Sequence, residues 1–369
     1  MSLLTLPLEL RLQIAWSLDS QADVARLAQT CRSLYSSTSW VLYRWNRLYG
    51  NNSALNWAVL HNVPDIFHCA CRAGTIVARQ NLNLVHIAAT TAHADMIPTL
   101  IQYGFGHSAC DENGERPLSI AARHGSLQVF QALVDCGADI SLSYANGQTP
   151  LHVAAGAGRT DITKLLLDAG AAVSPSLNAP NMSAPVRTKG WTPLHEAVEC
   201  NNFEVARLLV QHGADPVMAD LVDITGTSPL EIALTKRYID IATFLLENGA
   251  DLSVLPGADT AYPIFVATQH RDVELVKLLL QYGAETNSRG MLSPLRHALT
   301  NKLEEIAGLL LSAGADLSLA GTGGLTGLDY AARCGMVNII DVVHRTRCKN
   351  SPPSVNMGAG IVMNRAIKS

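Results

Sequence analysis

The chain has 369 residues, of which 48% are hydrophobic, 5% are aromatic and only 16% are charged. This is enough apolar material to bury a large core, which excludes a wholly disordered chain, and the few aromatic residues predict a core of Leu, Ala, Ile and Val. The net charge is −4 and no run of Lys and Arg occurs, so the sequence lacks the basic footprint of a protein that binds nucleic acid or an anionic membrane. The length allows two or more ordinary domains or one long array.

The cysteines and the apolar segments exclude several other classes of protein. The eight cysteines are scattered singly apart from Cys69 and Cys71, and no pair of C-x-x-C motifs suggests a zinc site. Single thiols are typical of a reducing compartment. Glu9 and Arg11 interrupt the apolar start of the chain, which therefore does not resemble a signal peptide, and no apolar run is long enough to span a membrane. We expect a cytoplasmic or nuclear protein with no metal and no cofactor.

Residues 3–48 are the first predicted unit. Their apolar residues are spaced as in three short amphipathic helices, over roughly 7–17, 21–29 and 31–47. Pro7 falls in the first turn of the first helix, where the missing backbone N–H has no partner to lose. No flexible linker comes after residue 48, so this unit is expected to be joined rigidly to the rest of the chain.

The same segment resembles an F-box domain, whose pattern is Leu-Pro-x-Glu, then an Ile and a Leu, a Cys-Arg pair and a late Trp. F-box domains dock on the Skp adaptor of cullin–RING ubiquitin ligases. The alternative is that the three helices only cap the rest of the chain and bind nothing. The residues that match the pattern, and that the resemblance implies for adaptor binding, are Leu6, Pro7, Ile14, Leu18, Cys31 and Arg32.

One nine-residue phrase recurs over residues 49–346 and organises the main body of the chain. It reads Gly-Gln-Thr-Pro-Leu-His-Val-Ala-Ala at 147–155 and Gly-Trp-Thr-Pro-Leu-His-Glu-Ala-Val at 190–198. The commonest step between copies is 33 residues, so about nine similar units are expected to stack on one another. The aligned position, which is Pro in the best copies, is occupied by Ala54, Leu84, Pro117, Pro150, Pro193, Pro229, Pro263, Pro294 and Gly327.

Each copy of the phrase predicts a pair of helices. Thr149 and Thr192 stand directly before the Pro, where they suit a helix N-cap, and Pro is tolerated in the first turn. A Leu-rich segment such as residues 165–167 predicts the second helix, and about ten residues then return as a turn or hairpin to the next copy. The glycines that come after the second helices, and that are expected to supply left-handed C-caps, are Gly170, Gly213, Gly249, Gly283 and Gly314.

The phrase and its period resemble the ankyrin repeat. This resemblance implies an all-α solenoid of about nine helix-turn-helix units joined by hairpin loops, with a concave face that binds a protein target. Residues 174–189, rich in Ser, Pro, Ala and Asn, are predicted to form an inserted loop within the array. Residues 347–369 come after the last helix and are predicted to form a flexible C-terminal tail.

The ankyrin resemblance also separates structural from functional candidates. His86, His152 and His195 share one position of the phrase, and in ankyrin repeats that His bonds the backbone of the neighbouring hairpin. Trp191 is a large aromatic residue at a position that we expect to be exposed, beside the inserted loop, and is therefore a candidate binding anchor. The residues expected to line the concave face and to bind a partner or ligand are Arg123, His124, Gln148, Lys189, Trp191, Glu199, Lys236, Gln269 and His270.

The sequence contains no catalytic motif. A phosphate loop, a nucleophile elbow, a zinc signature and a dinucleotide fingerprint are all missing, so no catalytic residue is assigned. His124, Glu199 and His270 are the groups that an acid–base mechanism would use, but they belong to different repeats. We therefore predict a substrate receptor that links a protein target to a Skp/cullin ligase. The alternatives are a plain scaffold with a helical cap, and a ligand-binding or catalytic solenoid whose pocket lies near Trp191.

Overall fold

The computed structural model describes residues 53–72, 83–143, 147–174, 191–217, 227–252, 262–287, 293–316, 331–333 and 335. Within these ranges every regular element is an α-helix and no strand is present, which confirms the predicted all-α class. The segment 1–48, nearly all of the predicted insertion at 174–189 and the tail 347–369 lie outside the described residues. The chain divides into two compact units, Met1–Thr188 and Lys189–Ser369, which are described separately.

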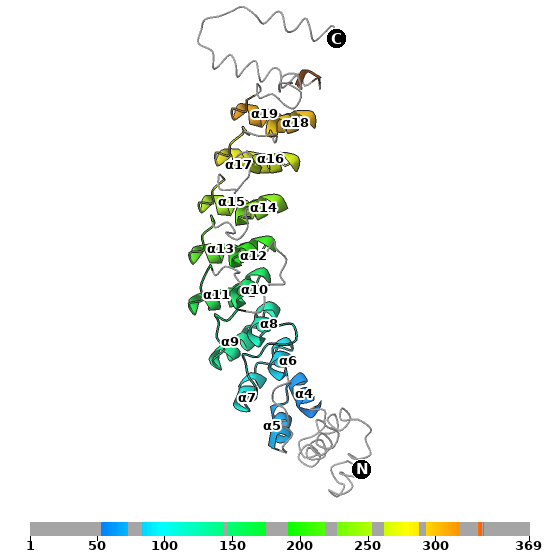
Figure 1. Cartoon of the computed structure of the whole chain (residues 1–369), viewed down its shortest axis with the longest axis vertical. Helices are drawn as coiled ribbons and strands as arrows, with labels where there is room; N and C mark the ends of the chain where they lie inside the picture. Colours follow the sequence, from blue (N-terminus) through cyan, green and yellow to red (C-terminus); the bar gives the residue numbers. More distant parts are fainter. Residues whose placement is uncertain are drawn as a thin grey trace, which may run out of the picture. The chain divides into compact units, whose positions relative to one another are not determined.

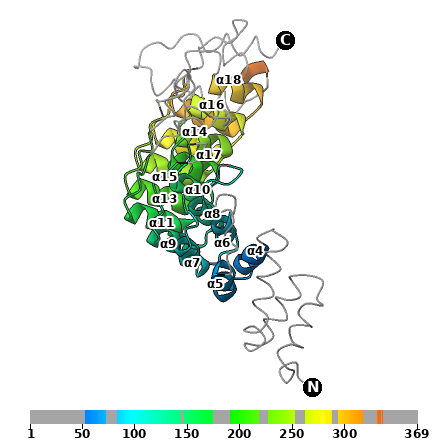
Figure 2. The same ribbon diagram turned by 60° about the horizontal axis from the view of Figure 1, so that its bottom comes forward.

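The described residues of the first unit form a stack of four helix pairs (Figures 1 and 2). The first helix of each pair packs on the first helix of the next, and the second helices form a parallel row beside them. The pairs are α4 (Ser53–Leu60) with α5 (Pro64–Arg72), α6 (Leu84–Thr90) with α7 (Met96–Gln102), α8 (Pro117–His124) with α9 (Leu127–Asp135), and α10 (Pro150–Gly156) with α11 (Thr160–Asp168).

The second unit repeats the same arrangement. Its first helices also pack on one another in chain order, so that α12, α14, α16 and α18 succeed each other along one side (Figure 1). The pairs are α12 (Pro193–Glu199) with α13 (Phe203–Gln211), α14 (Pro229–Lys236) with α15 (Ile239–Glu247), α16 (Tyr262–Gln269) with α17 (Val273–Gln281), and α18 (Pro294–Thr300) with α19 (Glu304–Ser312).

The core of each pair combines small residues from the first helix with leucines from the second. Ala154 and Ala155 of α10 are fully buried, as is Leu166 of α11, and the equivalent residues of the other pairs are buried in the same way. An alanine pair leaves room for the next first helix to pack closely, while the leucine fills the space between the two helices of the pair. The sparse aromatic content of the sequence agrees with this packing.

Each second helix that is described to its end stops at a left-handed glycine, as the sequence predicts. Gly170 has φ +83°, its N–H donates to the carbonyl oxygen of Leu167 at 3.0 Å, and the N–H of Ala171 donates to that of Leu166 at 2.9 Å. This is the Schellman arrangement, which satisfies carbonyl groups that the helix leaves unpaired. Gly213, Gly249, Gly283 and Gly314 have the same left-handed backbone, with φ between +78° and +93°.

A second left-handed position, not anticipated from the sequence, ends the first helix of every pair. It lies eight residues after the aligned Pro position, and we call it the left-handed slot. All nine copies show a positive φ there, including the last copy, in which few residues are described. This regularity supports the nine-copy alignment of the sequence. The slot is occupied by Asn62, Ala92, Gly125, Gly158, Asn201, Arg237, Arg271, Lys302 and Gly335.

Ala92 should be strained in this slot, because its exposed side chain accompanies a backbone φ of +61°. A left-handed backbone costs a residue with a Cβ roughly 1–2 kcal/mol, whereas the extra freedom of glycine in the unfolded chain costs about 0.4–1 kcal/mol. Ala92→Gly is therefore expected to raise the free energy of unfolding, measured by urea denaturation, by about 0.5–1 kcal/mol.

The matched control is Ala169→Gly, at an exposed helix end where φ is −79°. No strain is relieved there, so this change should lower stability by about 0.5–1 kcal/mol. Equal effects of the two substitutions, in sign and size, would contradict the assignment of strain to Ala92.

Candidate functional site

The histidine of the repeated phrase joins neighbouring repeats, as the ankyrin resemblance implies. In the copy at α12, the backbone N–H of Thr192 donates to His195 Nδ1 at 3.1 Å. Because Nδ1 accepts, the ring proton belongs on Nε2, which donates to the carbonyl oxygen of Thr227 in the next repeat at 3.1 Å. His86 Nε2 makes the same contact with the carbonyl oxygen of Glu115. These histidines are buried parts of the scaffold that connect one repeat to the next.

Glu231 takes the place of this histidine in the copy at α14. The N-cap Ser228 accepts a hydrogen bond from the Glu231 N–H at 3.1 Å through its Oγ, and the Glu231 carboxylate accepts one from the Ser228 backbone. Burial raises the pKa of Glu231, and the bond from Ser228 opposes that rise only in part. An ionised carboxylate has no proton to donate, so Glu231 reproduces the capping half of the histidine's role and not the donor half.

The candidate residues that the structure describes lie at the C-terminal ends of the first helices or just before them. Arg123 and His124 end α8 and are exposed, and Gln269 and His270 hold the equivalent exposed positions at the end of α16. Gln148 is half-buried just before α10. Lys189 lies outside the described residues.

Two ion pairs involve the candidate residues, one in each compact unit. Lys236 at the end of α14 bonds the carboxylate of Glu199 at the end of α12, so the structure brings these two predicted residues together. Arg123 bonds the carboxylate of Glu115, which precedes α8 in the same repeat. Both pairs are partly exposed, so each contributes on the order of 0–1 kcal/mol to stability.

The prediction that Trp191 is exposed is wrong. Only 8% of this residue is accessible to solvent, and its ring stacks on that of His195, with centroids 6.0 Å apart and planes 22° apart. The physical reason is its position two residues before the helix, beside the buried histidine that contacts the next repeat. Trp191 therefore packs within the scaffold and is not presented as a surface anchor.

Of the residues of the catalytic alternative, Glu199 and His270 lie two repeats apart in the second compact unit, and His124 belongs to the first. The Glu199 carboxylate is already bonded to Lys236. Among the residues that the structure describes, no group of three His, Cys, Asp or Glu side chains could hold a metal ion. Within the same residues, no helix has both the length and the apolar character needed to cross a bilayer.

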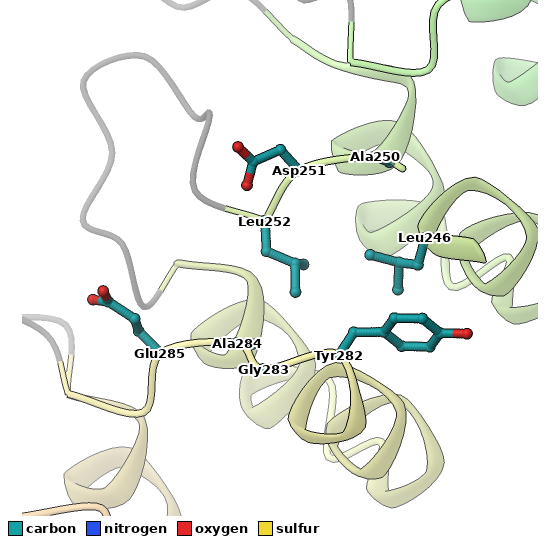
Figure 3. Close-up of a pocket in the computed structure, with 8 residues that line it drawn as sticks. All are labelled: Leu246, Ala250, Asp251, Leu252, Tyr282, Gly283, Ala284 and Glu285. Carbon is teal, nitrogen blue, oxygen red and sulfur yellow. The ribbon is translucent and has the colours of Figure 1, made fainter. Parts of the chain in front are cut away.

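A pocket of about 370 Å³ lies elsewhere, between the C-terminal ends of α15 and α17 (Figure 3). Two leucine side chains and the ring of Tyr282 occupy one side of it, while Asp251 and Glu285 lie on the other. Its lining contains no histidine and none of the candidate residues. The residues around it are Leu246, Ala250, Asp251, Leu252, Tyr282, Gly283, Ala284 and Glu285.

Sequence reasoning missed the charges in the left-handed slots. Arg237 donates to Asp272 Oδ2 from Nη2 at 2.8 Å and from Nε at 3.0 Å, across the junction between two repeats. Asp272 is buried and also caps α17, since its Oδ1 accepts from the N–H of Leu275 at 3.1 Å. Arg271 and Lys302 occupy the same slot in the next two repeats and are exposed. The signal that could have found them is their common offset from the aligned Pro position.

Comparison with known proteins agrees with this geometry. A family model described as "Ankyrin repeats (3 copies)" matches more than half of the chain, over residues 48–144, 142–220 and 177–256. The solved ankyrin repeat domain of Bcl-3, described as a unique member of the IkappaB family, is 27% identical with a TM-score of 0.50, and the match covers 63% of this chain and 99% of that domain.

Two curated relatives match shorter segments. An ankyrin repeat protein of fowlpox virus (strain NVSL) is 33% identical over 155 residues, which are 42% of this chain and 34% of the relative. A Saccharomyces cerevisiae protein named as the probable 26S proteasome regulatory subunit p28 is 31% identical over 149 residues, which are 38% of this chain and 63% of the relative. The chain thus spans less than two thirds of either relative.

Proposed function

Because the chain belongs to the ankyrin-repeat family, whose arrays are protein-interaction scaffolds, we propose that it is a substrate receptor for ubiquitylation. In this proposal the array holds a protein target at the exposed ends of its first helices. Residues 1–48 dock on the Skp-type adaptor of a cullin ligase. The chain itself does no chemistry and works in the cytoplasm or nucleus.

The proposed binding of a target is supported by the hydrogen bonds that fix the helices on which the exposed residues lie. The ends of α14 and α16 carry exposed polar side chains on helices whose own junctions are fixed. The bonds from His195 to Thr227 and from Arg237 to Asp272 each tie one repeat to the next. A surface fixed in this way loses little conformational entropy on binding, which is the advantage of a preformed scaffold. This is the observation that carries the binding function.

The adaptor half is supported by the sequence of the first 48 residues, which lie outside the described residues. Leu6, Pro7, Ile14 and Leu18 supply the apolar positions of the F-box pattern, and Cys31 and Arg32 supply its Cys-Arg pair. The Saccharomyces cerevisiae relative named as a probable 26S proteasome regulatory subunit is a second support for the proposed role in ubiquitylation.

The adaptor half is tested by titrating the intact chain with purified Skp adaptor in a calorimeter. We expect binding, and we expect Leu6→Asp with Ile14→Asp to weaken it at least tenfold. Burying a Leu or Ile side chain contributes about 1.5–3 kcal/mol, and about 1.4 kcal/mol corresponds to a tenfold change in Kd. The matched control is Leu60→Asp, an apolar-to-acidic change at a residue of α4 that is 47% exposed, which should leave the affinity unchanged.

Circular dichroism of each variant shows whether the helices survive the substitutions. Failure of the intact chain to bind the adaptor would exclude the ligase role and leave a plain scaffold whose first 48 residues act as a cap. Equal weakening by Leu60→Asp and by the double substitution would place any adaptor contact outside the predicted docking residues.

A further inference from the structure

We propose that a row of basic side chains at the ends of α14, α16 and α18 binds an extended acidic segment of the protein target. The row, called here the basic row, consists of Arg237, Arg271 and Lys302 in the left-handed slots, with Lys236 and His270 one residue earlier. This inference rests on the proposed target-binding function of the array. It specifies that the bound segment of the target is acidic.

The spacing of the row suits an extended peptide. Its five residues are all exposed, and their helices pack in order, α14 on α16 and α16 on α18. Packed helices lie about 8–10 Å apart, so successive left-handed slots recur at about that distance. An extended chain rises about 3.3 Å per residue, so about three residues of a bound segment span one repeat. A carboxylate at about every third position would meet one basic side chain per repeat.

Among the described residues, carboxylates neutralise only part of the charge of the row. Lys236 is paired with Glu199, and Arg237 is paired with Asp272, which stands one position after the slot of the next repeat. The residue equivalent to Asp272 one repeat further on is Leu303, so Arg271 lacks the same counter-charge.

Arg271 and Lys302 form no ion pair with any carboxylate in the described part of the chain. The positive field of Arg271 reaches the neighbouring helix α18. Burial lowers the pKa of His297 there, and the Arg271 charge lowers it further. Two positive charges in adjacent repeats are therefore left without a carboxylate partner among the described residues, as the proposal requires.

The same features favour an acidic peptide over a nucleic acid. Proteins that bind single strands stack bases on exposed aromatic rings, as well as contacting phosphates. Among the described residues, Leu60 and Tyr282 are the exposed large hydrophobic side chains, and neither lies in the basic row. The row presents one slot charge per repeat, without the dense Lys and Arg cluster that a phosphate backbone attracts.

The test measures binding of a fluorescein-labelled peptide of ten glutamates to the full chain by fluorescence anisotropy, beside a peptide of ten glutamines. We expect the glutamate peptide to bind more tightly at 50 mM salt than at 500 mM salt, because screening weakens exposed charge contacts. Arg271→Glu with Lys302→Glu should weaken binding at least tenfold. The neutral pair Arg271→Gln with Lys302→Gln should give an intermediate loss.

The matched control is Lys164→Glu with Arg207→Glu, which changes the net charge by the same amount at exposed residues of α11 and α13. Equal weakening by this control would show that only the overall charge matters, and would overturn the proposal. So would an unchanged affinity in the Arg271 and Lys302 variant, or a single-stranded ten-nucleotide DNA that binds the row more tightly than the peptide does. Adaptor binding by the same variant is measured in parallel, so failure of the basic row is distinguished from failure of the ligase role.

Discussion

Replacing His195 by alanine is expected to lower the free energy of unfolding by about 3–4 kcal/mol, a large share of the stability of an ordinary domain. The imidazole is fully buried and bonds Thr192 within its own repeat and Thr227 in the next. Its removal leaves the buried N–H of Thr192 and the partly buried C=O of Thr227 without their partner, the buried group at a cost of about 1–3 kcal/mol, and opens a cavity beside Trp191. Urea denaturation followed by far-ultraviolet circular dichroism measures the change.

His270→Ala is the matched control for this substitution, because it removes the same side chain from an exposed position. Surface changes of this kind usually alter stability by less than about 0.5 kcal/mol. A loss below about 1 kcal/mol for His195→Ala would show that the bond between the repeats contributes little, and would contradict the structural role assigned to the phrase histidine.

Asp272→Ala is expected to cost about 2–3 kcal/mol at pH 7, because it removes an N-cap and a charge-assisted bond between two repeats at once. Burial raises the pKa of Asp272, but the hydrogen bonds from the Leu275 N–H and from Arg237 outweigh it, so the net pKa in the folded protein is lowered. A lowered folded pKa means that the stabilisation is fully present above the unfolded value of about 3.9 and is lost as the pH falls through the folded value.

The stability difference between the natural chain and Asp272→Ala should therefore be large at pH 7 and should shrink below about pH 4. Asp272→Asn separates the two contributions, since asparagine caps a helix well but cannot pair as an anion with Arg237. It should show an intermediate loss at pH 7. Urea titrations at several pH values measure both effects, and a difference independent of pH would contradict the contribution of the ionised carboxylate.

The fold could be predicted from the sequence because its signals are local and repeated. Thr192 before Pro193 marks a helix start, and it does cap α12, with His195 completing the hydrogen bonding. Gly213 marks the end of α13, since glycine is the residue that adopts a left-handed backbone without strain. Because the same signals recur at a constant spacing, each copy supports the interpretation of the others.

The surface was harder to predict because the residue type does not reveal exposure or backbone conformation. Trp191 suggested an anchor, but stacking on His195, which depends on tertiary packing, buries it. The left-handed backbone of the slot was not predicted from the sequence for a different reason. Its occupants include Gly158, Asn201 and Arg271, which share no side-chain chemistry, so the residue types alone do not show that these positions are equivalent.

In the left-handed slot, the residue that best stabilises the backbone differs from the residues that the proposed binding function needs. Glycine would fit it without strain, yet Arg237, Arg271 and Lys302 occupy it in three successive repeats at a cost of roughly 1–2 kcal/mol each. Selection for stability alone would drive these positions towards glycine and erase the charges that they present. If the proposed binding function holds, single substitutions at Arg271 and Lys302 would change the partner that the array accepts, whereas a substitution at Arg237 would also break its bond to Asp272 across the junction.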